Sequence, residues 1–454
     1  MFDDLLKLIK NSPRWAHSSL ARRLGFSFTY GHHDEDEDSE VIAGRWYVET
    51  DWTKLHVSGS KPPVRSGHSS VVGTLLLTRH HQPHVRATLV NGVMYIFGGY
   101  NEGNCHYDLY AFNLVHHHWT KLANRGGIVP DGRASHAWCA STDETKLYLF
   151  GGSGPHWGQT NMGKLLQFSI ATHEWTIVPT TGTHPPPGYG QSMVSIHNKL
   201  YLFGGTSGHV YVNDMYVFDE LLGAWTCLVT HGTKPSPRYK HQAVVVGRDM
   251  YIIGGGLYDP PKGFIDMHKF DTLTSTWSPV TCVGALPCSR IAHTVTVYAP
   301  DAASPQFLMF GGRDEAGVRL NELSQFDVTT ATWTRLEEDA NAPDARDFHT
   351  SAVWGHAMYV FGGSNGDERN SDVFRYLMRY DPPTLTILAI QSIQEQLRSS
   401  RAMQRQYKGA HMPRELTDAI ESLNAHVRAT SNEAWFPLPE QHAMALPPSF
   451  SPCR

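Results

Sequence analysis

One short motif with chemical potential recurs along the chain. Within residues 46–382 an arginine is followed three positions later by a histidine in five places. Each guanidinium presents a planar fork of donors that suits carboxylates and phosphates, so five of them around one channel mouth would form a binding site for such anions. The five pairs are Arg65 and His68, Arg133 and His136, Arg238 and His241, Arg290 and His293, and Arg346 and His349.

A structural role explains the same motif. Arginine can stack on an aromatic ring and donate to turn carbonyls of a neighbouring repeat, while histidine can cap a strand. A motif repeated this often is most simply part of the framework, so the arginine ring is either structural or binding. Gly188-Tyr189-Gly190-Gln191 stands where a further copy is expected. Tyr189 and Gln191 are therefore the positions where this chain departs from a purely structural array.

The elements that carry this motif are themselves repeated. An apolar strand that ends in two glycines occurs six times, most clearly as Tyr201-Leu202-Phe203-Gly204-Gly205. Repeats with a period near fifty residues are typical of arrays built from one structural unit. The first glycines are Gly98, Gly151, Gly204, Gly254, Gly311 and Gly362, which gives spacings of 53, 53, 50, 57 and 51 residues.

A tryptophan followed by threonine or serine is the third marker, and it also occurs six times. Between each Gly-Gly and the next tryptophan lies another short strand pattern, such as Asn213–Asp219. Each unit is therefore predicted to contain four short strands separated by turns. The tryptophans are Trp52, Trp119, Trp175, Trp225, Trp277 and Trp333.

Together these markers resemble the kelch repeat, and the resemblance covers residues 46–382. It implies an all-β protein, a six-bladed propeller with one four-stranded antiparallel blade per repeat. Trp52 precedes the first Gly-Gly, and no tryptophan of this kind follows the sixth. The strand of Trp52 is thus predicted to complete the sixth blade and close the ring. The alternative outer strand is Thr384–Leu388.

The flanking segments differ in composition from the repeats. Residues 1–45 include a run of acidic residues from Asp34 to Glu40 and are predicted to be a flexible acidic tail. Residues 383–430 are predicted to form a helical extension and residues 431–454 a disordered tail. About 17 residues near 73–90 are extra in the first repeat; they are a loop insertion or an error in the gene model.

Antiparallel geometry predicts which segments share a face. Connections alternate between the two ends of a four-stranded blade, so the Arg-x-x-His segments and the loops after Gly-Gly open on one surface. These segments carry aromatic and arginine side chains of the kind that dominate protein interfaces. The predicted partner-binding residues are Tyr100, His156, Trp157, Tyr189, Gln191, Tyr211, Tyr258, Phe264, Arg313 and Arg369.

Composition narrows the function classes. A net charge of −5 gives no reason to expect nucleic-acid binding. No long apolar run or secretory signal is recognised, so we expect a protein that is not bound to membranes and is cytoplasmic, possibly also nuclear. The six cysteines lack a C-x-x-C pair and the histidine runs lack neighbouring acidic or cysteine ligands. No metal and no cofactor are therefore expected.

The main functional prediction is an interaction scaffold or adaptor. The kelch resemblance implies docking of a protein or peptide partner on the loop face, possibly as a substrate receptor for a ubiquitin ligase. No BTB domain or clear F-box is recognised, and no catalytic motif occurs in its expected context, so no catalytic residue is predicted. The alternative is an isomerase-like enzyme that binds an anionic sugar in the central channel. The sequence indicates no oligomeric state.

Overall fold

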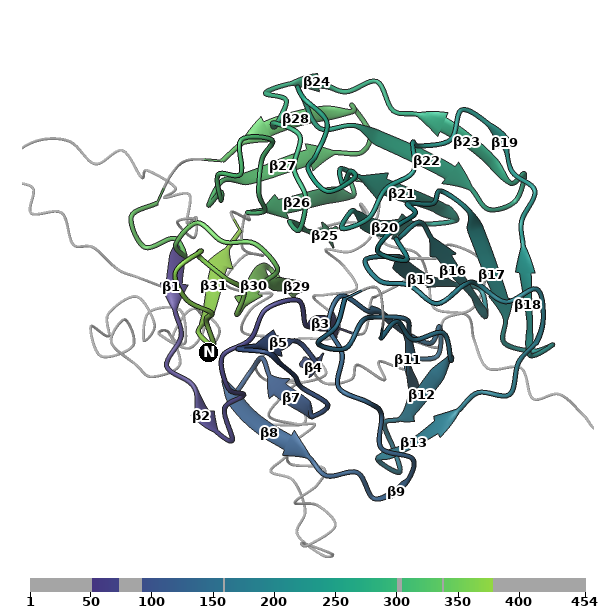
Figure 1. Cartoon of the computed structure of the whole chain (residues 1–454). Helices are drawn as coiled ribbons and strands as arrows, with labels where there is room; N and C mark the ends of the chain where they lie inside the picture. The colour runs from purple at the N-terminus through teal and green to yellow at the C-terminus, as the bar shows by residue number, and fades with distance from the viewer. Residues whose placement is uncertain (1–50, 73–91, 158–159, 300–303, 337–338, 379–454) are drawn as a thin grey trace, which may run out of the picture. The chain divides into compact units, whose positions relative to one another are not determined.

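The computed structural model describes residues 51–72, 92–157, 160–299, 304–336 and 339–378 (Figure 1). All of them belong to one compact unit, Met1–Tyr380, whereas the second unit, Asp381–Arg454, lies outside the described residues. The predicted acidic tail, the insertion at 73–90, the helical extension and the C-terminal tail also lie outside them.

The described residues form an all-β propeller of six blades, as predicted (Figure 1). Within each blade four strands pair antiparallel in a meander, with the first strand innermost and the last outermost. The blades are numbered 1 to 6 in the order of their innermost strands.

Blade 1 contains β3 (Ser69–Val72), β4 (Val93–Phe97), β7 (Leu109–Asn113) and β8 (His118–Leu122), with a small hairpin of β5 (Tyr100–Asn101) and β6 (Asn104–Cys105) after β4. Blade 2 contains β10 (Ala137–Ala140), β11 (Lys146–Phe150), β12 (Leu166–Ser169) and β13 (Glu174–Ile177). Blade 3 contains β15 (Ser192–Ile196), β16 (Lys199–Phe203), β17 (Met215–Asp219) and β18 (Ala224–Cys227).

Blade 4 contains β20 (Gln242–Val246), β21 (Asp249–Ile253), β22 (Met267–Asp271) and β23 (Thr276–Pro279). Blade 5 contains β25 (Thr294–Tyr298), β26 (Gln306–Phe310), β27 (Leu323–Asp327) and β28 (Thr332–Arg335). Blade 6 contains β29 (Thr350–Trp354), β30 (Ala357–Phe361) and β31 (Val373–Leu377), and its outer strand is β1 (Trp52–Lys54).

The ring closes with a strand from the other end of the propeller. Strand β1 pairs antiparallel with β31, with Trp52 opposite Tyr376. The backbone N–H of Trp52 also donates to Asp339 Oδ2 at 2.7 Å, which ties β1 to the segment that leaves blade 5. The predicted closure by the Trp52 strand is therefore confirmed, and the ends of the repeat array are held in one sheet.

A fifth strand that the sequence analysis missed extends five of the blades. The chain entering each of blades 1 to 5 adds two residues in parallel to the outer strand, always with glycine second. These glycines have positive φ, and a Cβ there would collide with the carbonyl oxygen of the outer-strand tryptophan. The strands are β2 (Ser58–Gly59), β9 (Gly126–Gly127), β14 (Thr181–Gly182), β19 (His231–Gly232) and β24 (Val283–Gly284).

The core lies between neighbouring blades and is built from the repeated aromatics. Phe203, which precedes the Gly-Gly of blade 3, packs against Trp277 of blade 4 with ring centroids 5.1 Å apart. Trp277 also contacts Phe270 of its own blade at 4.7 Å. The borrowed Trp52 fits the same pattern, because it lies 5.1 Å from Phe310 of blade 5. Each tryptophan thus stabilises both a blade and its junction with the preceding blade.

Replacing one of these tryptophans tests the packing. We expect Trp277→Ala to lower the free energy of unfolding by about 3–5 kcal/mol, because it opens a cavity at a junction between blades. Denaturant unfolding measures the change. Leu273→Ala is the control, because Leu273 is exposed on the turn before β23. Equal stability of the two variants would contradict the role assigned to Trp277.

Candidate functional site

The five repeated arginines lie inside the propeller. Each is at most 3% exposed, and its Nη1 donates to the carbonyl of the first glycine of its own blade, from 2.8 Å for Arg65 to 3.2 Å for Arg290. Each Nε donates to the carbonyl two residues earlier at 3.0–3.1 Å. The turn carbonyls thus belong to the same blade, whereas a neighbouring blade was expected.

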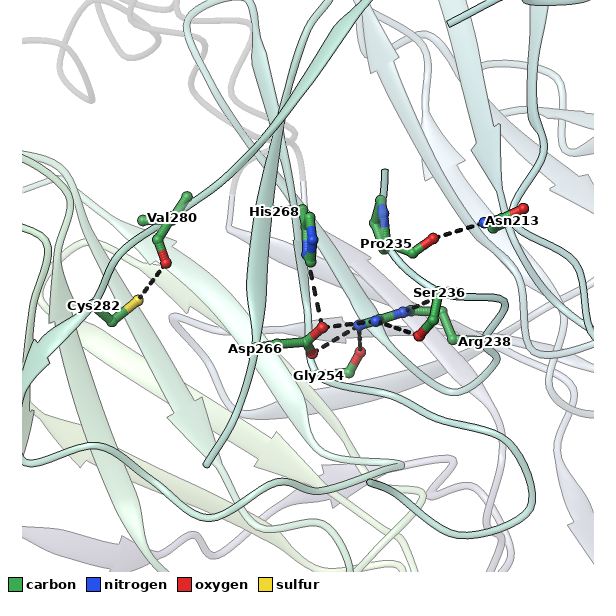
Figure 2. Close-up of polar contacts among 9 residues, drawn as sticks. All are labelled: Asn213, Pro235, Ser236, Arg238, Gly254, Asp266, His268, Val280 and Cys282. Atoms are coloured by element: carbon green, nitrogen blue, oxygen red, sulfur yellow. Dashed lines mark hydrogen bonds and ion pairs between the residues drawn. The ribbon is translucent and has the colours of Figure 1, made fainter. Parts of the chain in front are cut away.

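Four of the five guanidinium groups also bind a carboxylate at the start of the third strand. Figure 2 shows the pair in blade 4, where Arg238 Nη1 and Nη2 donate to the two oxygens of Asp266 at 2.8 and 2.7 Å. Arg65 pairs with Asp108, Arg290 with Glu322, and Arg346 with Asp372. Each of these guanidinium groups therefore has internal hydrogen-bond partners, which is the arrangement of a structural framework.

The partner histidines join neighbouring blades. His241 of blade 4 lies edge-on to Phe203 of blade 3, with centroids 5.4 Å apart, and its Nε2 forms a 2.8 Å hydrogen bond with Ser192 Oγ. Burial, followed by the nearby Arg238 guanidinium, lowers the pKa of His241 to about 3. Burial, followed by the arginine of the same blade, also lowers the pKa of His136 and of His293 to about 3; these arginines are Arg133 and Arg290. These histidines are therefore neutral in the folded protein.

A closed ring of backbone hydrogen bonds surrounds the centre of the propeller. It is formed by the residue before each histidine, or before Gln191 in blade 3, and all six residues have a left-handed conformation with φ between 53° and 69°. The N–H of each donates to the carbonyl of its counterpart in the preceding blade at 2.7–3.0 Å. In order, Phe348 donates to Ala292, Ala292 to Lys240, Lys240 to Gly190, Gly190 to Ser135, Ser135 to Gly67, and Gly67 to Phe348.

A second set of bonds places the loops after Gly-Gly beside these segments. In every blade the residue that follows the arginine position forms a backbone bridge to the residue after Gly-Gly, as Ser66 does with Tyr100 and Tyr189 with Thr206. The predicted sharing of one face is therefore confirmed for these two kinds of segment.

Six aromatic side chains on this face form an aromatic rim, which we define as Tyr100, Trp157, Tyr189, Tyr211, Tyr239 and Tyr258. Five of them form a chain of ring contacts across blades 1 to 4. The centroid distances are 6.4 Å for Tyr100–Trp157, 5.1 Å for Trp157–Tyr189, 6.1 Å for Tyr189–Tyr239 and 5.2 Å for Tyr239–Tyr211. Trp157 and Tyr258 are exposed, whereas Tyr239 is buried.

Cationic side chains flank the aromatic rim. Arg369 lies over Tyr100 at 5.0 Å, and Arg313 lies over Tyr258 at 6.0 Å. The ammonium of Lys240 lies 4.5 Å from the ring centres of both Tyr239 and Phe348. Burial, followed by the neighbouring Arg313 guanidinium, lowers the pKa of Lys240 to about 8. The face therefore combines aromatic surface with positive charge that is partly removed from water.

The structure brings together most of the predicted partner-binding residues, namely Tyr100, Trp157, Tyr189, Tyr211, Tyr258, Arg313 and Arg369. Phe264 and His156 are exposed on the loops of this face, but neither has a described ring contact with the aromatic rim. Gln191 lies elsewhere: it is 8% exposed and occupies the buried histidine position of blade 3. It is therefore part of the framework in this structure rather than of the surface.

Sequence reasoning missed Tyr239, Lys240 and Phe348. All three stand between the arginine and the histidine of a repeat, as Tyr189 stands before Gln191. The signal was their place in the repeat. Lys240 and Phe348 stand directly before the histidine and are partly accessible, whereas Tyr239 follows the arginine and is buried.

Two properties of the described residues bear on other classes of function. Within the described ranges, no three His, Cys, Asp or Glu side chains are grouped as a metal would require. No helix in this part of the chain has the length and apolarity needed to span a bilayer.

The blades and their repeated residues define a β-propeller of the kelch type. A family model described as the KLHDC2/KLHL20/DRC7 Kelch-repeats domain matches residues 84–302 and 240–408, which is more than half of the chain. The chain belongs to the kelch-repeat family.

Three relatives are similar to this chain over about two thirds of its length, and the chain spans less than a third of the two host cell factors. Host cell factor 2 of Homo sapiens is 29% identical over 309 residues, which are 65% of this chain and 32% of that protein. Host cell factor 1 of Homo sapiens is 27% identical over 337 residues, 71% of this chain and 13% of that protein. Kelch domain-containing protein 3 of Bos taurus is 28% identical over 320 residues, which are 66% of this chain and 68% of that protein. These kelch relatives support a role in protein interaction.

The buried histidines predict a dependence of stability on pH. His241 has a folded pKa of about 3 against an ordinary value of 6.5. As the pH falls below 6.5 the unfolded chain gains a proton that the folded chain does not, so the free energy of unfolding decreases until about pH 3. His241→Gln introduces the residue that blade 3 has at this position, Gln191. In this variant the free energy of unfolding should fall less steeply below pH 6.5, by about 1.4 kcal/mol per pH unit.

Urea unfolding at pH 7, 6 and 5 measures this difference. The control is His209→Gln, because His209 is exposed on the loop after β16. The same pH dependence in wild type and His241→Gln would contradict a neutral buried histidine.

Proposed function

We propose that the chain is an interaction scaffold that binds a protein or peptide partner on the aromatic rim. The observation that carries the proposal is the chain of ring contacts from Tyr100 to Tyr211, which joins four blades into one surface. Aromatic and arginine side chains contribute most to binding when they are held rigid, because little side-chain entropy is then lost.

The rigidity of this surface follows from its supports. Tyr189 and Tyr239 stand one residue before members of the backbone ring, and both form bridges to the loop after Gly-Gly. Arg369 is held by a 3.1 Å hydrogen bond from its Nε to Ser66 Oγ, in addition to its position over Tyr100. A partner therefore meets side chains that are already oriented.

Removing the exposed contacts tests the proposal. We expect the triple variant Trp157→Ala, Tyr258→Ala and Arg313→Ala to lose partner binding by at least ~10-fold, since hot-spot truncations cost about 2 kcal/mol or more. Affinity capture with the full chain, quantified by mass spectrometry, identifies partners that depend on the rim. The affinity of one purified partner is then measured by calorimetry.

The matched control is Leu221→Ala with Leu222→Ala. Both leucines are exposed, and they lie on the turn between β17 and β18, at the opposite end of the blade. This control should bind as the wild type does, and both proteins should keep the wild-type melting temperature. Full binding by the folded triple variant would show that the aromatic rim is not the docking surface.

A role as substrate receptor is the finer form of this proposal. It requires two separable surfaces, one for the substrate and one for a ubiquitin ligase. The same capture separates them: ligase subunits should remain bound to the triple variant after the rim-dependent partner is lost. Absence of ligase subunits from both samples would exclude the receptor role and leave the scaffold.

A further inference from the structure

Blade 3 lacks the repeated arginine but keeps its backbone frame. Gly188 stands at the arginine position, and its carbonyl accepts a 2.9 Å hydrogen bond from Gly152 N. Arg133 accepts the same bond from Gly99 N, also at 2.9 Å. Blade 3 therefore keeps this backbone bond, with no side chain projecting from the arginine position. A Cβ on Gly188 would lie 2.8 Å from the Thr206 carbonyl oxygen.

The groups that bind arginine in the other blades are still present in blade 3. In blade 1 they are the Gly98 carbonyl, the Asp108 carboxylate and the Tyr110 ring, over which Arg65 lies at 5.2 Å. Their counterparts are Gly204, Asp214 and Tyr216. We call these three residues with Gly188 the blade-3 slot.

The backbone holds Asp214 in the same place as its counterparts. Gly204 N donates to the Asp214 carbonyl at 3.3 Å, as Gly98 N does to Asp108 at 3.4 Å and Gly254 N to Asp266 at 3.0 Å. The backbone of Asp214 therefore occupies the position from which Asp108 and Asp266 bind a guanidinium group in blades 1 and 4.

Three residues of the blade-3 slot are accessible to solvent, whereas Gly188 is buried. Asp214 is exposed, whereas the side chains of its four counterparts are between 14% and 35% exposed. Gly204 is half-buried, whereas the first glycine of each other blade is buried. Tyr216 is half-buried, whereas Tyr110 is buried. Among the described residues Asp214 forms no ion pair, so its carboxylate is available to a ligand.

We propose that the blade-3 slot binds the guanidinium group of an arginine side chain supplied by a partner protein. The filled slot of blade 4 shows the recognition (Figure 2): a fork to both carboxylate oxygens at 2.8 and 2.7 Å and a bond to the glycine carbonyl at 2.8 Å. Asp214, the Gly204 carbonyl and the Tyr216 face offer an acceptor pair, a third acceptor and a stacking surface.

Blade 2 keeps the arginine but lacks the acidic residue, so it offers no comparable slot. Arg133 is present there, but Lys164 stands where the other blades have an acidic residue. Arg133 keeps its bond to the Gly151 carbonyl at 3.1 Å and remains buried, so its place is filled. In blade 3 the carboxylate and carbonyl acceptors are present, but the arginine that would donate to them is absent.

The proposal is independent of the aromatic rim as the docking surface, although the two features adjoin. Tyr189 of the rim directly follows Gly188 in the sequence. A partner with an arginine in the blade-3 slot would therefore have its neighbouring residues beside the rim.

Small guanidinium ligands test the blade-3 slot directly. The full chain is titrated with N-acetyl-arginine amide, and binding is followed by NMR through the backbone amides of Gly204 and Asp214. We expect saturable shifts at these amides that N-acetyl-citrulline amide, which has the same shape without the charge, does not produce. Asp214→Asn should weaken the arginine ligand by at least ~10-fold, because a charge-assisted fork is lost.

Asp367→Asn is the matched control, because Asp367 is an exposed carboxylate on a loop of the same face. It should bind the arginine ligand as the wild type does. Equal shifts with the citrulline ligand, or unchanged binding by Asp214→Asn, would overturn the proposal. Either result would leave partner binding by the aromatic rim untouched. Conversely, the triple variant at Trp157, Tyr258 and Arg313 can lose its partner and still bind the arginine ligand in the blade-3 slot.

Discussion

The structure depends on one closed cycle of six backbone hydrogen bonds at the centre of the propeller. Each member of the cycle is in the left-handed conformation, and four of the six, Ser135, Lys240, Ala292 and Phe348, are not glycine. That conformation costs roughly 1–2 kcal/mol for a residue with a side chain. It persists because each residue donates to one neighbouring blade and accepts from the other, so no blade can shift alone.

The remainder of the framework follows from this cycle. The cycle fixes the Arg-x-x-His segments. Each arginine can then donate to the first glycine carbonyl of its own blade, and each histidine packs against the preceding blade. The second glycine of every blade then donates to the carbonyl at the arginine position of the next blade, from Gly99 with Arg133 to Gly363 with Arg65. Between the arginine and histidine positions the first residue is buried in five of the six blades, whereas Lys240 and Phe348, which stand second, are partly accessible. One motif therefore supplies both the buried framework and part of the face that carries the aromatic rim.

Much of the fold could be predicted from the sequence because it rests on local repetition. The six Gly-Gly strands gave the blade number, and the position of Trp52 gave the closure by β1. The five parallel edge strands were missed, since each has two residues and depends on a tryptophan carbonyl in another segment. Their one signal is the glycine seven or eight positions after a tryptophan, such as Gly182 after Trp175.

The candidate site was predicted less completely, because burial depends on partners far along the chain. Four of the buried arginines pair with an acidic residue that follows by 26 to 43 positions, as Asp372 follows Arg346 and Asp108 follows Arg65. Arg133 is buried without such a partner, so the motif alone does not reveal the environment of its guanidinium group. Gln191 looked like a surface residue because it differs from its counterparts, yet it fills the same buried position. In blade 3 the unusual residue is Gly188, and its effect is to expose Asp214.

We infer that the six left-handed residues act as one cooperative ring that holds the face with the aromatic rim. Native-state amide hydrogen exchange, resolved by NMR at Gly67, Ser135, Gly190, Lys240, Ala292 and Phe348, tests it most directly. We expect all six amides to exchange with one common opening free energy, close to that of global unfolding. Fast exchange at some of them, through local opening of single blades, would contradict it.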